Sequence, residues 1–227
     1  ISYRLVGSEM CIRDSLYELR SGNRIKDFQF NDRITHPDWS PDGESIVAVF
    51  IKDNIDGQNF TVNSDMEFQR GAIVEIAWDG DAQELGDWTV LKEADTAVNF
   101  YYPAYSPEGD WIAYNRSTTT SYAAQDAELW LMSRDGSVDV RLKNANGDGD
   151  LQNSYPRWGP LPDDDVLWLA FSSRRTYAVD PDDEPQIWVA AILPELAEKD
   201  EDPSSAPFWL PGQEVGSDNH LPVWWAQ

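Results

Sequence analysis

The sequence predicts an all-β protein, and within that class an incomplete β-propeller of four-stranded antiparallel blades. Three observations lead to this prediction. The phrase Pro-x-aromatic occurs at residues 37–39, 103–105, 156–158 and 222–224. Two copies run directly into Ser-Pro-Asp/Glu-Gly, at residues 40–43 and 106–109, and an apolar run follows. A unit repeated in this way is typical of architectures whose copies stack on one another.

The Ser-Pro-Asp/Glu-Gly segments have the chemistry of a type I turn. Proline sets φ at the second position, serine suits the first position and glycine suits the fourth. The third copy, at residues 159–163, reads Gly-Pro-Leu-Pro-Asp and is degenerate. The phrases are spaced more widely than the about 40–50 residues of a standard blade, so each unit is expected to carry insertions.

The strands of each blade follow in order. Second strands, apolar on both faces as in stacked sheets, are predicted at residues 45–50, 111–115 and 166–172. Third strands that end in polar turns are predicted at residues 16–19, 73–78, 129–132 and 187–192. More polar, outer fourth strands are predicted at residues 24–28, 88–92, 138–142 and 208–210. Residues 193–199 suit a single helical turn. The sum is about three full blades, a partial blade at the start and a first strand at the end.

Tryptophan is abundant, and its positions in the repeat favour a packing role. Trp39, Trp130, Trp158 and Trp188 are predicted to pack between blades rather than to stack on a carbohydrate.

Residues 1–15 share neither composition nor pattern with the rest of the chain. They resemble a translated sequencing adaptor, so they are interpreted as a non-native or disordered terminus. Residues 16–227 are predicted to form one partial propeller domain, and the chain is interpreted as a truncated gene product. Cys11 is the single cysteine, so no disulfide can form within the chain.

The chain is strongly acidic, with 41 acidic and 17 basic residues and a formal net charge of −24. This balance opposes binding to nucleic-acid phosphates or to an anionic membrane surface. It permits binding of divalent cations or basic partners, and the alternative is that the charge only keeps the surface solvated. Each apolar run is far shorter than the ~20 residues of a membrane-spanning helix.

No catalytic pattern stands out. The nucleophile elbow Gly-x-Ser-x-Gly is absent from the sequence. The two histidines, His36 and His220, each precede a Pro-x-Trp phrase, which favours a structural or channel-facing role. A metal site shared by both is conceivable only if the fold brings them together.

One segment has the spacing of a calcium loop. Asn144, Asn146, Asp148 and Asp150 place oxygen-bearing side chains at alternate positions, with glycines between the last three. The segment departs from the helix–loop–helix calcium motif because its first position is Asn and its twelfth is Tyr155. The alternative is a surface turn, and no other cofactor is expected.

Long insertions are the other candidate binding elements, since binding residues tend to lie in loops on a rigid scaffold. The insertions cover residues 52–71, 118–126, 176–184 and 194–219. Arg174 and Arg175 stand out in an acidic chain and are expected to pair with inserted carboxylates or with a ligand carboxylate. Candidate partner-binding loops therefore lie near Arg174, Arg175, His36 and His220.

The repeated unit resembles that of TolB-like propellers. Residues 37–50 and 103–114 are close matches, and residues 170–175 with 185–189 are similar to the second and third strands of the same unit. The resemblance implies six or more blades in an intact ring, and a propeller that binds proteins in the bacterial periplasm or accompanies a peptidase. Its motif consists of turn and core residues, so it indicates architecture more than function.

The sequence thus predicts a non-enzymatic propeller that binds a protein or peptide through rim loops, in a periplasmic or extracellular setting. The alternative is a non-catalytic propeller domain of a larger, peptidase-like hydrolase.

Overall fold

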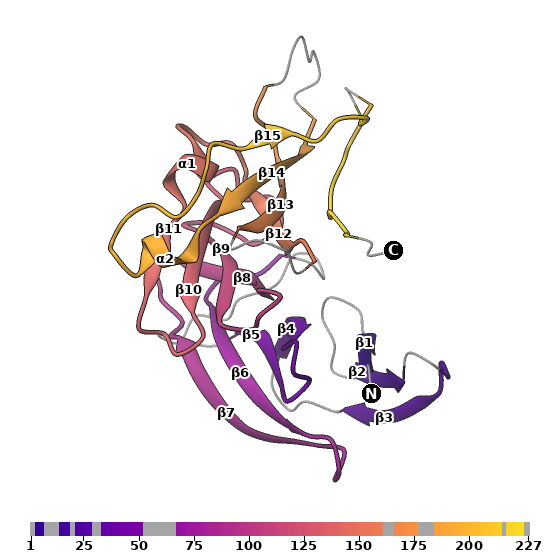
Figure 1. The fold of residues 1–227 in the computed structure, drawn as a ribbon. Helices are drawn as coiled ribbons and strands as arrows, with labels where there is room; N and C mark the ends of the chain where they lie inside the picture. Colours follow the sequence, from indigo (N-terminus) through magenta and orange to yellow (C-terminus); the bar gives the residue numbers. More distant parts are fainter. Residues whose placement is uncertain are drawn as a thin grey trace.

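The computed structural model describes residues 3–6, 14–18, 21–28, 33–51, 67–160, 166–176, 184–214 and 217–224. Its regular structure is almost entirely β. Three four-stranded antiparallel sheets follow one another along the chain, and the strands of each sheet lie side by side in sequence order (Figure 1). The predicted fold, an incomplete β-propeller, is confirmed, and these sheets are its first, second and third blades.

The strand bounds agree closely with the predicted ranges. The first blade contains β4 (Arg33–Trp39), β5 (Ser45–Ile51), β6 (Gly71–Asp79) and β7 (Glu84–Lys92). The second contains β8 (Asn99–Tyr105), β9 (Trp111–Ser117), β10 (Glu128–Ser133) and β11 (Asp139–Arg141). The third contains β12 (Ser154–Trp158), β13 (Leu167–Ser173), β14 (Gln186–Ile192) and β15 (Phe208–Trp209). Two short helices, α1 (Lys143–Asn146) and α2 (Pro194–Ala197), follow β11 and β14.

The start of the chain contributes a sheet of three strands. β1 (Tyr3–Val6), β2 (Asp14–Glu18) and β3 (Arg24–Phe28) pair antiparallel in that order. The strands β2 and β3 correspond to the strands predicted at residues 16–19 and 24–28. The interpretation of residues 1–15 as a non-native or disordered terminus stays a prediction, and within it the backbone of β1 pairs with β2.

The predicted turns hold the first and second strands together. The amide of Gly43 donates to the carbonyl of Ser40 at 2.9 Å, and that of Gly109 donates to Ser106 at 2.9 Å. Both glycines have a positive φ, 74° and 85°, a conformation that side chains with a Cβ rarely adopt. The Ser40 hydroxyl also accepts the amide of Ser45 at 2.9 Å, so the serine closes the turn it begins.

Each first strand contains one extra residue just before its proline, and the sequence did not reveal it. In β4, three steps from Thr35 to Asp38 oppose two steps from Val49 to Val47 on β5, and β8 and β12 repeat this bulge. The residues that precede the four prolines, His36, Tyr102, Tyr155 and Leu221, have φ of 49°, 49°, 56° and 55°. Such backbone costs about 1–2 kcal/mol per residue, so packing must hold it in place.

The core lies between the blades. One face of the second blade packs on the third through a cluster that includes Leu129, Leu131, Leu169, Phe171 and Trp188, whose side chains are 0–7% exposed. Burying each of the larger side chains stabilises the fold by about 1.5–3 kcal/mol.

The packing role predicted for tryptophan is confirmed for Trp158 and Trp188, which are 9% and 7% exposed. Trp39 lies edge-on to Trp78 at 5.8 Å, and Trp130 packs at the border of the cluster between the first and second blades.

The predicted first strand at residues 222–224 is corrected. These residues form no strand among those the structure describes. The physical reason is that a strand needs a ladder partner, and the described residues offer none at this position. The segment lies instead along the third blade, with the Trp224 indole donating to the carbonyl of Arg157 at 3.1 Å.

Candidate functional site

An open groove of about 680 Å³ crosses the three blades. We call it the turn groove, because most of its lining comes from turns of the second blade. Its lining residues are Glu75, Asp110, Trp111, Ser133, Arg134, Asp135, Ser137, Val138 and Glu198. Glu75 comes from β6 of the first blade, and Glu198 follows α2 of the third. The residues that form the groove are far apart in sequence, so only blade stacking brings them together.

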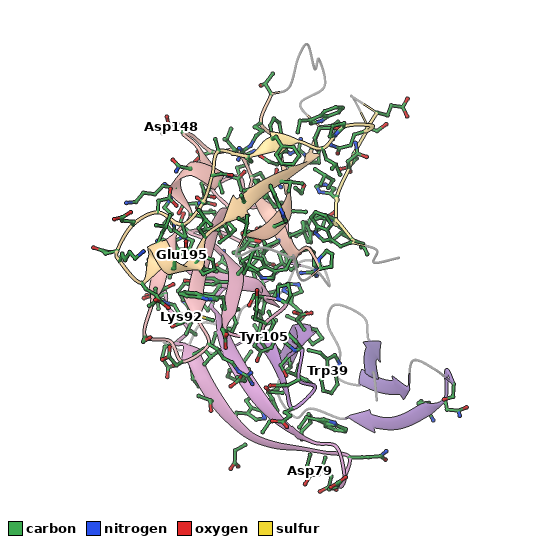
Figure 2. All side chains as sticks on the ribbon, in the orientation of Figure 1. Trp39, Asp79, Lys92, Tyr105, Asp148 and Glu195 are labelled. Carbon is green, nitrogen blue, oxygen red and sulfur yellow. The ribbon has the colours of Figure 1, made fainter. Side chains whose placement is uncertain are left out.

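Arg134 ties the second blade to the first at the wall of the groove. Its Nε donates to Glu75 Oε1 at 2.7 Å, its Nη2 to Ser45 Oγ at 2.6 Å and its Nη1 to Asp42 Oδ2 at 3.2 Å. The guanidinium also lies over the Tyr105 ring at 5.4 Å. Figure 2 shows Tyr105 between the two blades, and its hydroxyl donates to Glu75 Oε1 at 2.5 Å.

The electrostatics of the groove are acidic. Hydrogen bonds from Ser133 and then Ser137 lower the pKa of Asp135 to about 2, so this carboxylate stays charged over a wide pH range. Three further carboxylates, Glu75, Asp110 and Glu198, line the same space, and Arg134 is the one cation among the described residues of its lining. The Trp111 ring and Val138 supply an apolar floor. The groove therefore offers negative charge beside apolar surface.

A row of rings runs across the first strands of the blades. The His36 ring lies 4.0 Å from the Tyr102 ring, which lies 4.2 Å from the Tyr155 ring, and the His220 ring follows at 5.9 Å. The hydroxyl of Tyr102 donates to that of Tyr155 at 2.9 Å. The two tyrosines stand between the histidines, so the structure does not bring His36 and His220 together.

His36 is held neutral by its surroundings. Burial, and then the nearby charge of Arg157, lower its pKa to about 3. Its Nδ1 accepts the amide of Tyr102 at 3.5 Å. The ring packs at 5.4 Å from Phe68 on its other side. These contacts suit a packing role. The two histidines are also not equivalent in the repeat, since His36 directly precedes its proline and His220 is one residue further away.

Ser172, His220 and Asp218 form a hydrogen-bonded chain. The Ser172 hydroxyl lies 3.0 Å from His220 Nδ1, and His220 Nε2 lies 2.7 Å from Asp218 Oδ1. The distances suit proton transfer, and Ser172 is only 1% exposed. These hydrogen bonds fasten residues 218–220 to β13. Sequence reasoning missed it, because no spacing signal links β13 to the end of the chain.

The residues of the predicted calcium loop lie on α1 and just after it. Asn146 is 1% exposed, and its Oδ1 accepts the amide of Leu129 at 2.8 Å while its Nδ2 donates to the Leu129 carbonyl at 2.8 Å. Asn144 donates from Nδ2 to the Ser204 carbonyl at 2.9 Å. Asp148 and Asp150 are exposed. Asn146 thus holds α1 against β10, and calcium binding by the four residues stays a prediction.

Arg175 is a structural cation in this geometry. Its Nη2 donates to the carbonyl of Ala145 at 2.7 Å and to Asn153 Oδ1 at 2.7 Å. The guanidinium also lies over the Phe171 and Trp188 rings, at 5.3 and 5.1 Å. Burial lowers its pKa to about 10. Its Nε donates to Ser173 Oγ at 3.0 Å, so among the described residues its partners are carbonyl, amide and hydroxyl oxygens rather than the expected carboxylates.

The contacts of Arg174 are closer to the expected pairing with carboxylates of the insertions. Its Nε donates to Gln152 Oε1 at 2.6 Å, and its Nη1 lies 4.0 Å from Glu184 Oε2 in the insertion that follows. The insertion at 118–126 is tied down by Asp126, which accepts the amide of Thr118 at 2.6 Å. Residues 52–66 and 177–183 of the other insertions lie outside the described residues.

Two general findings complete the site. In the described part of the chain, no group of three or more His, Cys, Asp or Glu side chains is placed to hold a metal ion. None of the helices formed by those residues is long and apolar enough to cross a bilayer.

Comparisons with known proteins find likeness in structure but not in sequence. No protein-family model and no curated protein sequence matches the chain. A putative TolB from Agrobacterium tumefaciens is 19% identical with a TM-score of 0.44, over 78% of this chain and 56% of its own. TolB from Acinetobacter baumannii is 18% identical with a TM-score of 0.44, over 78% of this chain and 34% of its own. An oligogalacturonate lyase in complex with manganese is 14% identical with a TM-score of 0.49, over 84% and 46%.

TolB proteins, whose repeat the sequence resembles, are among these structural neighbours. The likeness concerns the fold alone. The chain spans about half the length of the first of these chains, and about a third of the second.

Proposed function

We propose that this chain is part of a non-catalytic β-propeller that binds a protein or peptide partner through one rim, in the bacterial envelope or outside the cell. The turn groove is the observation that carries this proposal. It is open, it crosses three blades, and rigid β-sheet turns form most of its lining. Binding surfaces are commonly built in this way, from loops on a rigid scaffold.

The chemistry of the groove favours a basic partner segment. Lysine or arginine side chains of an extended peptide would meet Asp110, Asp135 and Glu198, and their aliphatic stems would lie on Trp111 and Val138. Arg134 is already bonded to Glu75 and Asp42, so it does not neutralise the other carboxylates. The net charge of −24 acts in the same direction at longer range, because it attracts a cationic partner.

The absence of catalysis and the location are parts of the same proposal. Burial of Ser172 supports a non-catalytic role, and the envelope setting follows from the resemblance of the repeat. Recovery of the whole gene tests both. A signal peptide and further Pro-x-Trp repeats would support the proposal, whereas a Gly-x-Ser-x-Gly segment would overturn it.

A direct binding test uses a fluorescently labelled decapeptide of alternating lysine and leucine, followed by fluorescence anisotropy. The double change Asp110→Lys with Glu198→Lys reverses two charges of the groove and is expected to weaken binding roughly tenfold. The matched control reverses two exposed charges outside the groove, Asp87→Lys with Asp148→Lys. Equal weakening by both variants would show that only the net charge attracts the peptide, and would refute the groove as the site.

A further inference from the structure

The last strand of the first blade presents a long backbone edge. Among the described residues, β7 (Glu84–Lys92) pairs with β6 alone and ends its sheet, and Figure 1 shows it along the outer margin of the molecule. It has nine residues, whereas the last strands of the second and third blades, β11 and β15, have three and two. Alternate residues of such a strand direct their amide and carbonyl groups away from the sheet. We call this outward side of β7 the β7 edge.

The β7 edge lacks several features that commonly keep an edge strand from pairing. Such strands are usually very short, or they contain proline or lysine. β7 contains no proline, and its one lysine, Lys92, lies at its end and pairs with Asp139 of the second blade. None of the residues of β7 is buried. Trp88 and Val90 are 38% and 48% exposed and two residues apart, so they present apolar surface on one face beside the edge.

Two bulges limit the length over which another strand can pair. Residues 85–88 and 90–92 of β7 each contain one residue more than the facing part of β6. A bulge twists the strand and interrupts its ladder. Between the bulges, residues 88–90 pair with residues 74–76 of β6 in unbroken register. The part of β7 best suited to accept a further strand is therefore short, and it carries the two exposed apolar side chains.

The charge of the β6–β7 hairpin favours a basic strand. Residues 79–91 run from the end of β6 to the last residue before Lys92, and they contain no lysine or arginine. They contain four carboxylates, those of Asp79, Asp81, Glu84 and Asp87. Figure 2 shows Asp79 at the tip of this hairpin. These carboxylates attract a segment that carries lysine or arginine and repel another acidic strand.

From these observations we infer that the β7 edge is a second interaction surface, on which a short, extended, basic segment of another protein pairs as an additional strand. Backbone hydrogen bonds to residues 88–90 supply the pairing, and apolar side chains of the segment lie on Trp88 and Val90. A second copy of this chain is the competing occupant, and its net charge of −24 opposes that association. No residue of β7 lines the turn groove, so this inference goes beyond the proposed function and can fail while the groove proposal holds.

The test uses the full chain carrying Asp110→Lys and Glu198→Lys, so that the turn groove is disabled. The probe is a fluorescently labelled hexapeptide of alternating lysine and valine, followed by anisotropy. At saturating peptide, hydrogen–deuterium exchange within residues 84–92 is expected to slow at least about threefold, because outward amides become bonded. N-methylation of two adjacent central residues of the peptide is expected to weaken binding at least about tenfold, because adjacent amides of a strand face opposite edges and both edges are then blocked.

A matched pair of variants assigns the binding to β7. Trp88→Lys with Val90→Lys places two cations beside the edge and is expected to weaken binding at least about tenfold. Tyr122→Lys with Val223→Lys makes the same change in charge at exposed apolar residues outside β7, and is expected to weaken binding less than about threefold.

Four outcomes would overturn the inference: no binding of the hexapeptide, unchanged exchange within residues 84–92 when it is bound, full binding of the N-methylated peptide, or equal weakening by the two pairs of variants. A parent chain that sediments as a dimer and dissociates on Trp88→Lys with Val90→Lys would overturn it in favour of a second copy. The N-methylated peptide and the exchange measurement probe an unaltered β7, so the test does not depend on how well the β7 variant folds.

Discussion

Arg175 offers the sharpest test of how the second and third blades are joined. It follows β13, and its guanidinium reaches back to α1 of the second blade and to the loop after it. The change Arg175→Ala removes the donor to the Ala145 carbonyl and to Asn153 Oδ1, both at 2.7 Å. It also removes the cation over the Phe171 and Trp188 rings.

The expected loss can be worked from these contacts. Each hydrogen bond from a charged donor contributes about 1.5–3 kcal/mol, and the ring contacts add about 1 kcal/mol. Burial lowers the pKa of Arg175 to about 10, so the desolvation of the guanidinium offsets part of this gain. The net expectation for Arg175→Ala is a fall of about 3 kcal/mol in the free energy of unfolding. Arg175→Lys keeps the charge without the planar fork, and is expected to lose about half as much.

Urea unfolding followed by tryptophan fluorescence measures the loss, and an unchanged m-value shows that the folded state is otherwise intact. The adjacent Arg174→Ala is the control. Its side chain is 35% exposed, its ion-pair contact is long, and its Nε donates to Gln152 Oε1, so it is expected to cost about 1.5 kcal/mol, half the loss for Arg175→Ala. If the two alanine variants differ by less than about 0.5 kcal/mol, the role assigned to Arg175 is refuted.

Three further predictions follow from the ring row and from α1. Because the folded pKa of His36 is lowered to about 3 from 6.5, the stabilising effect of the neutral ring is present above pH 6.5 and is lost as pH falls towards 3. The variant His36→Asn keeps a residue type that tolerates a left-handed φ, and it is expected to flatten the dependence of unfolding free energy on pH by up to about 1.4 kcal/mol per pH unit in that window. An unchanged slope would contradict this expectation. Tyr102→Phe and Tyr155→Phe are each expected to lower the free energy of unfolding by about 1 kcal/mol. In a double-mutant cycle measured by chemical denaturation, the double variant is expected to lose less than the sum of the two. Strict additivity would mean that the two hydroxyls do not share a hydrogen bond. Asn146→Ala is expected to cost about 1–3 kcal/mol, because the Leu129 amide loses its acceptor while the Leu129 carbonyl still accepts the amide of Leu142 at 3.1 Å. The separate calcium hypothesis requires the wild-type melt to fall on chelation and ends if it does not.

Much of the fold could be predicted because the determinants are local. Ser40 and Gly43 specify their turn within four residues, and β5 and β9 can be recognised from their own runs of residues that are apolar on both faces. The third strands β6 and β10 were equally clear, since each ends at a polar turn. Such signals need no knowledge of the rest of the chain.

The turn groove and the ring row could not be predicted, because their determinants are far apart. Glu75 and Arg134 meet only when the first and second blades stack, and in sequence each is one charged residue among many. The Asn146 amide looked like a calcium ligand by spacing, and the fold directs it to the backbone of β10. Arg175 looked like a carboxylate partner by charge, and its described partners are neutral oxygens.

The extra residue in each first strand has a consequence for how these blades can change length. Side chains alternate across a strand, so the bulge before Pro37 reverses which face the following Asp38 and Trp39 would otherwise occupy. Deleting one residue there would leave the number of strands unchanged. It would turn the end of β4, from Pro37 to Trp39, to the opposite face of the sheet, so that Trp39 would point away from Trp78. The insertions between strands can lengthen freely, whereas the count of residues between the start of a first strand and its proline is fixed. A blade of this type is therefore tolerant of insertion between its strands and intolerant of insertion within its first strand.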